Sequence, residues 1–126
     1  MQTTNPTPPD TDFRLLSAIE DVKGTKVYSP TGEHLGHVDD LMIDPADGRI
    51  SYGVLQFGGL FGIGGDHQLI PFGKLRYDHG LNGYVTDLTK EQLEGAPAWD
   101  EGWRSDRAWQ RRSYEYYGLS PWWPVP

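Results

Sequence analysis

The 126-residue chain is 37% hydrophobic, which is enough for one compact core and too little for two. Its net charge of −7 argues against a nucleic-acid partner, and the lack of cysteine excludes disulfides, thiolate metal sites and cysteine nucleophiles. Because 16 glycines and 10 prolines disfavour a helix-dominated fold, we expect strands and turns.

The first dozen residues are polar and contain three prolines, the composition of an extended or disordered tail over residues 1–14. They have neither the basic start nor the apolar run of a signal peptide. The longest apolar stretch, residues 52–63, is diluted by glycine and too short to span a bilayer. We therefore expect a cytoplasmic protein without membrane insertion.

Short apolar runs separated by turn residues predict a small, mostly antiparallel β-barrel between about residues 20 and 87. A helical turn capped by Ser17 precedes it, and Gly36 is expected to bend or bulge the second strand. The predicted strands cover residues 25–29, 34–44, 49–57 and 66–72, followed by a ribbon of 75–77 and 83–85. The predicted core contains Val27, Leu41, Ile43, Val54, Leu69, Ile70 and Val85.

Five glycines surround Leu60, Phe61 and Ile63 between residues 58 and 65, which predicts a long hairpin loop. A phosphate-binding loop would need a helix N-terminus after it, and here a β-type run ending at Pro71 follows. The three apolar side chains at the tip would form an exposed patch unless covered. We expect the tip either to fold back on the barrel or to contact another chain.

The C-terminal part of the chain is predicted to be helical and aromatic. A short helix begins after a cap at Asp87 or Thr89 and stops at Gly95. Residues 97–126 form an aromatic-rich arm with all five tryptophans and three of the seven tyrosines, and residues 105–117 in this arm predict a second helix.

The aromatic residues of the arm have two interpretations: they fill a core, or they form a binding surface. The candidate binding residues in the arm are Trp103, Trp109, Tyr116, Tyr117, Trp122 and Trp123. The arm is also locally basic through Arg104, Arg107, Arg111 and Arg112. An acidic surface, such as that of the chain's own barrel, is the natural counterpart of these arginines.

Residue types that carry chemistry are present without the spacing that a catalytic or metal site needs. His34, His37, Asp39 and Asp40 include metal-ligand types, but on a strand at most two of them share a face. Ser51, Asp66 and His67 have the residue types of a hydrolase triad without a nucleophile elbow. We therefore expect no catalytic residue, no structural metal and no cofactor.

The segment 19–28 followed by 32–44, with the pattern G-x-V-x-D-x-x-I-D, resembles the opening of a PRC-barrel domain. The strand at 50–55, the loop at 58–65 and the sequence I-P-F at 70–72 resemble that family's next elements in order and spacing. The resemblance covers about residues 15–95. It implies protein contact and not catalysis, as in the cytoplasmic domain of the photosynthetic reaction-centre H subunit and in a ribosome-maturation factor. Stand-alone bacterial PRC-barrel proteins are the nearer comparison.

Together these features predict a PRC-type β-barrel at residues 15–96 and a helical arm at 97–126. The predicted function is a non-enzymatic protein-interaction or assembly module, with a small-ligand or metal-binding sensor as the alternative. Because the arm and the loop tip carry more apolar surface than a small barrel covers, we also predict a homodimer formed through both.

Overall fold

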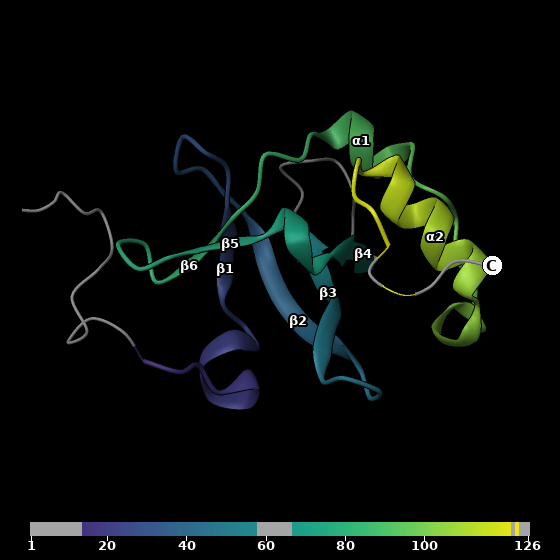
Figure 1. The fold of residues 1–126 in the computed structure, drawn as a ribbon. Coiled ribbons are helices and arrows are strands. Elements are labelled where there is room, and N and C mark those ends of the chain that lie inside the picture. Colours follow the sequence, from purple (N-terminus) through teal and green to yellow (C-terminus); the bar gives the residue numbers. More distant parts are fainter. Residues whose placement is uncertain (1–13, 58–66, 122, 124–126) are drawn as a thin grey trace, which may run out of the picture.

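A six-stranded mixed sheet forms the body of the chain in the computed structural model, which describes residues 14–57, 67–121 and 123 (Figure 1). The strand order is β4-β3-β2-β1-β6-β5. The β1–β6 pair is parallel, and the other neighbours are antiparallel. The strands are β1 (Lys26–Tyr28), β2 (His34–Asp44), β3 (Arg49–Phe57), β4 (His67–Pro71), β5 (Arg76–Asp78) and β6 (Gly83–Val85).

The sheet confirms the mainly β class but not the closed barrel. Among the described strands, β4 and β5 are the two sheet edges, and no ladder joins them. Pro71 ends β4 and has no amide hydrogen to continue a ladder. The turn η4 (Phe72–Lys74) then carries the chain to β5, at the opposite edge of the sheet.

The predicted core is correct at four of its seven positions, since Val27, Leu69, Ile70 and Val85 are buried. Leu41 and Val54 are half-buried. Ile43 was wrongly placed in the core: its side chain is 56% exposed. The register between β2 and β3 shifts between Met42 and Ile43, so the period-two alternation on which that prediction depended does not continue to the end of the strand.

The predicted bulge of the second strand lies beside Gly36, on the side that faces β1: Val27 pairs with Gly36 and Tyr28 with His34, so Leu35 is an extra residue of β2. A second irregularity of β2, against β3, falls between Val38 and Asp40. At Gly36 itself the two backbones approach closely: a β-carbon there would lie 2.8 Å from the Cα of Phe57 and would overlap the Gln56 carbonyl oxygen. The glycine is needed because no side chain fits between the strands.

The helices begin and end where local capping residues predict. Ser17 accepts a hydrogen bond from the Glu20 amide at the start of the turn η2 (Ala18–Val22). Thr89 and Gln92 form a capping box at α1 (Lys90–Glu94). Asp106 caps α2 (Arg107–Tyr116), which follows the turn η5 (Trp103–Ser105), and Gly118 takes a positive φ of 78° just beyond its end. None of the helices in the described ranges is long and apolar enough to cross a bilayer.

The arm packs against the sheet, as Figure 1 shows for α2 beside β3 and β4. Two apolar clusters result. The larger lies within the curved sheet and includes Val27, Val38, Leu55 and Tyr84. The smaller joins the sheet to the arm and contains Tyr52, Leu69, Trp103, Trp109 and Tyr114.

Candidate interaction surface

Tyr52 of β3 is the centre of the contact between sheet and arm. Its ring lies 5.3 Å from the ring of Trp103 and 5.5 Å from that of Tyr114, both edge to face, and 6.0 Å from that of Trp109. Tyr52 is fully buried. Edge-to-face aromatic pairs contribute beyond the area they bury, so this cluster holds the arm at a defined place on the sheet.

Hydrogen bonds from tyrosine hydroxyls fix the same contact. The Tyr114 hydroxyl donates to the Ser51 carbonyl at 2.6 Å, and the Tyr52 hydroxyl donates to the Gln110 carbonyl at 3.4 Å. Burial raises the pKa of both phenols above the ordinary value of 10.0. Both hydroxyls therefore remain protonated donors at physiological pH.

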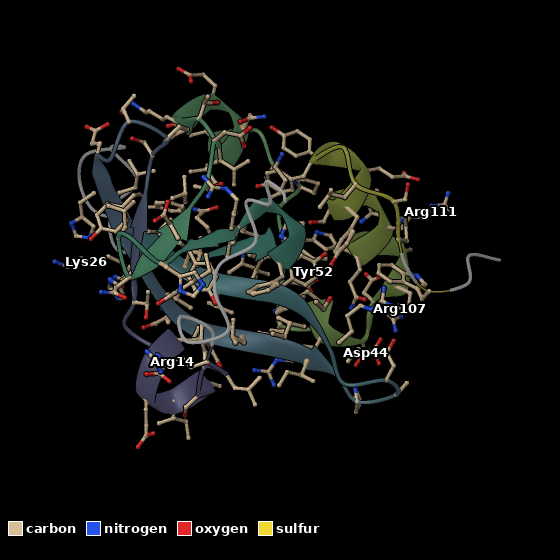
Figure 2. The ribbon with its side chains drawn as sticks, turned by 60° about the vertical axis from the view of Figure 1, so that its left-hand side comes forward. Arg14, Lys26, Asp44, Tyr52, Arg107 and Arg111 are labelled. Atoms are coloured by element: carbon tan, nitrogen blue, oxygen red, sulfur yellow. The ribbon has the colours of Figure 1, made fainter. Side chains whose placement is uncertain are left out.

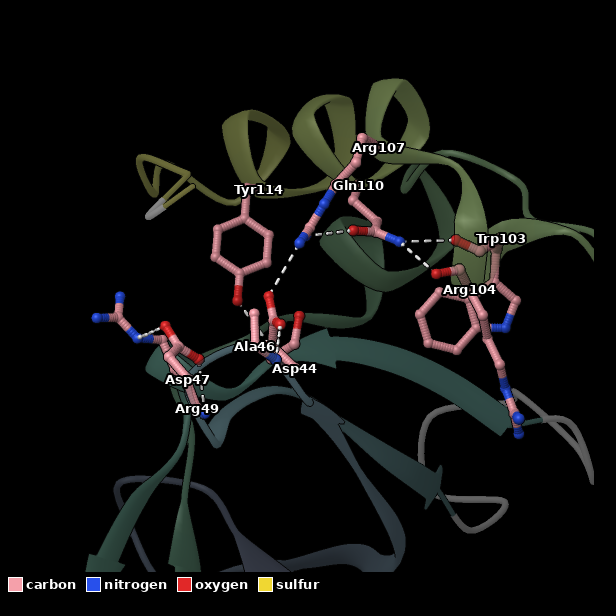
Figure 3. A network of polar contacts seen from close by, with 10 residues as sticks. Asp44, Ala46, Asp47, Arg49, Trp103, Arg104, Arg107, Gln110 and Tyr114 are labelled. Carbon is pink, nitrogen blue, oxygen red and sulfur yellow. Dashed lines mark hydrogen bonds and ion pairs between the residues drawn. The ribbon is translucent and has the colours of Figure 1, made fainter. Parts of the chain in front are cut away.

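A polar network continues the contact to the end of the β2–β3 hairpin (Figure 3). Arg107 donates to Asp44 Oδ2 and to Gln110 Oε1, each at 2.9 Å, and Gln110 Nε2 donates to the Trp103 carbonyl at 2.9 Å. The Arg107 guanidinium also lies 4.4 Å from the centre of the Trp123 ring. The Arg107 hydrogen bond is the main cause that lowers the pKa of Asp44, so that carboxylate stays charged near neutral pH.

Beside this network lies a cavity of about 300 Å³ that we call the β2–α2 groove. Figure 2 shows Asp44 and Arg107 facing each other here, with Arg111 further along α2. One wall comes from β2, β3 and their turn, and the other from η5 and α2. The groove is lined by Met42, Ile43, Asp44, Pro45, Ser51, Tyr52, Trp103, Arg104, Ser105, Arg107 and Gln110.

The structure separates the predicted binding residues by exposure. Trp103, Trp109 and Tyr117 are buried within the chain, which is the core-filling interpretation of the arm. Tyr116 is 41% exposed, and Trp123 is half-buried against the Tyr114 ring at 5.5 Å. The predicted loop-tip residues Leu60, Phe61 and Ile63, and also Trp122, lie outside the described residues.

A second cavity, of about 480 Å³, lies on the other side of α2. Trp99, which is 45% exposed, and Trp109 line it together with the segment between α1 and Ala98. Gln68 and Leu69 of β4 complete the wall. A cavity therefore lies on each side of α2, and the exposed Trp99 lines the second one.

His37 and Asp39 of β2, which the sequence places on one face of a strand, lie together with His67 of β4. His37 and His67 both pair with Gln56 of the strand between them, and the register shift at Val38/Asp40 leaves Asp39 between paired positions. Asp39 approaches the His67 ring nitrogen at 2.5 Å and that of His37 at 3.7 Å. This is a hydrogen-bonded pair with a neighbour; within the described ranges no three such side chains are placed to hold a metal ion.

The sequence indicated Trp103, Arg104 and Arg107 in the arm but not the opposite wall of the groove. Ile43 was predicted to be buried, and Tyr52 was not singled out. The run of arginines beginning at Arg104 was the available signal, because charged residues concentrated on one segment of an acidic chain need a counterpart. Asp44 provides that counterpart for Arg107 alone.

Two comparisons with known proteins bear on identity. The chain is 34% identical over 71 residues to an uncharacterized protein of Deinococcus radiodurans, an alignment that spans 56% of this chain and 25% of that protein. The chain thus spans about a quarter of the length of the relative. The model of the PRC-barrel domain matches residues 16–93, which include all six strands and most of α1. The chain therefore belongs to the PRC-barrel domain family.

Proposed function

We propose that this chain is a non-enzymatic protein-interaction module whose contact surface is the β2–α2 groove. The observation that carries the proposal is the exposed pair of Ile43 and Arg104 on opposite walls of the groove, beside an Arg107 already fixed by Asp44. Apolar and arginine side chains placed on a rigid support are the elements from which protein interfaces obtain most of their binding energy.

The groups that line the groove favour contact over chemistry. Asp44 and Arg107 neutralise each other at 2.9 Å, and the buried Tyr52 donates its hydroxyl proton to a backbone carbonyl. Each of these polar groups is engaged in holding the arm on the sheet. A general acid or base would instead need a group poised to exchange a proton with a substrate.

Site-specific photocrosslinking tests the proposal. In cells of the native organism, Ile43 is replaced by the photoreactive residue benzoylphenylalanine. The covalent adducts formed on illumination are identified by mass spectrometry. Leu81, 40% exposed in the β5–β6 turn, receives the same replacement as the matched control. Leu81 lies between β5 and β6, which Figure 1 shows far from α2.

We expect a discrete protein adduct from position 43 that position 81 does not form. Failure of position 43 to form any protein adduct, or adducts of the same identity and yield from both positions, would contradict the interaction function of this groove.

A further inference from the structure

We propose, on the basis of the proposed function, that the β2–α2 groove binds a short acidic segment of a partner protein that carries one apolar anchor residue. The groove combines two features in one cavity. One wall is arginine-rich in an otherwise acidic protein, and the other exposes an aliphatic side chain.

The charge of the groove selects an acidic partner. The charged residues of its lining are Arg104, Arg107 and Asp44, a net charge of +1, whereas the whole chain carries −7. At physiological ionic strength charges act over about 8 Å, so a short bound segment experiences these arginines more than the distant acidic surface. A nucleic acid would extend beyond the arginines over that acidic surface and be repelled. A short peptide fits the charge distribution better.

Arg104 supplies the carboxylate contact. Its side chain is exposed at the groove, and no hydrogen bond or ion pair holds its guanidinium within the described part of the chain. A guanidinium binds a carboxylate through two parallel N–H donors. Arg104 can form this contact without breaking one, whereas Arg107 is held by Asp44 and keeps the wall in place.

Ile43 supplies the apolar contact. It is 56% exposed, and Met42 and Pro45 lie beside it in the groove lining. The groove volume of about 300 Å³ accommodates one or two side chains, not an entire helix. The occupant that fits is therefore one apolar residue flanked by carboxylates.

Fluorescence polarisation on the full chain tests this partner chemistry. The probe is a fluorescein-labelled pentapeptide with one central leucine flanked on each side by two glutamates. The comparison peptides replace the glutamates by glutamines, or the leucine by glycine. The variants are Arg104→Glu and Ile43→Asp, and the matched control is Arg112→Glu, which changes the same charge on an exposed residue of α2 outside the groove. Circular dichroism establishes that each variant folds.

We expect the acidic leucine peptide to bind saturably, with an affinity that weakens as salt is added. In Arg104→Glu the affinity should fall roughly tenfold or more, because one charge-assisted hydrogen bond is lost. Ile43→Asp should lose a similar factor, and Arg112→Glu should change affinity less than about twofold, as a screened charge outside the groove. Equal binding of the glutamine peptide, an equal loss in Arg112→Glu, or tighter binding of a single-stranded oligonucleotide would each overturn the proposal.

The two experiments fail separately. A crosslink at position 43 together with no binding of the acidic peptide would leave the interaction function standing and refute the acidic partner. No crosslink and no peptide binding would refute both.

Discussion

Gly36 is a position where backbone geometry alone decides which residue is tolerated. Replacing Gly36 by Ala places a methyl group 2.8 Å from the Cα of Phe57, between two strands that cannot both keep their register. We expect the free energy of unfolding to fall by about 1–3 kcal/mol, the usual cost of overpacking a close contact. Urea denaturation monitored by tryptophan fluorescence measures this change in the free energy of unfolding.

The matched control for that substitution is Gly73→Ala. A β-carbon there meets only the flexible end of Leu119, at 3.4 Å. This control should change stability by less than about 0.5 kcal/mol. Equal effects of the two alanines would show that the approach of β2 to β3 does not require glycine.

Asp39 predicts a pH-dependent contribution to stability. The hydrogen bond from His67 is the main cause that lowers the pKa of Asp39 below its ordinary value of 3.8. A carboxyl whose pKa is lower in the folded state stabilises the fold above the unfolded pKa, and this contribution is lost as pH falls through the folded value. Because the pair is more than one-third exposed, we expect Asp39→Asn to cost at most about 1 kcal/mol at pH 7.

The difference in the free energy of unfolding between the wild-type chain and Asp39→Asn should have its full size above about pH 5. It should shrink as the pH falls toward the lowered pKa of Asp39. Parallel urea titrations at pH 7 and pH 3 measure it. Asp40→Asn is the control, because the Asp40 carboxylate accepts from the adjacent Leu41 amide, and an asparagine side-chain oxygen accepts the same hydrogen bond. A difference for Asp39→Asn that is constant with pH would contradict the assignment.

At the scale of elements, the sequence predicts what local chemistry determines. The β2–β3 hairpin begins and ends as expected because Gly48, with φ of 77°, provides the left-handed turn residue that the D-P-A-D-G sequence indicates. The caps at Ser17, Thr89 and Asp106 form for the same reason: each hydroxyl or carboxylate lies three residues before the amide that it accepts from.

Contacts between elements distant in sequence could not be predicted in this way. Tyr52 and Tyr114 meet across 62 positions, and Asp39 and His67 meet only because β3 places β2 and β4 in one register. Ile43 was misassigned because a register shift, invisible in the residue pattern, interrupts the alternation. The residues of the groove were therefore visible as a basic, aromatic composition, but their position against the hairpin was not.

At the scale of the whole molecule, the intramolecular packing of the arm changes what the dimer prediction requires. Trp103, Trp109 and Tyr117 are covered by their own chain, so they contribute to self-association only if the arm detaches. Among the described residues, the tryptophan and tyrosine side chains that remain exposed are Trp99 and Tyr116. Removing the arm by a truncation after Pro97 is the direct way to test its part in association. Because this truncation would also uncover the buried Tyr52, it would test folding as much as association.

We still expect a homodimer, because the apolar loop residues Leu60, Phe61 and Ile63 add to the exposed Trp99 on a chain of only 126 residues. Light scattering at micromolar concentration should report twice the 14.2 kDa chain mass. Replacing Leu60, Phe61 and Ile63 together by serine should give the monomer mass with an unchanged circular dichroism spectrum, while Trp99→Ser alone should weaken the dimer partially. A full-length chain that is monomeric at every concentration would refute self-association, and a dimer that survives both variants would move the interface elsewhere on the sheet.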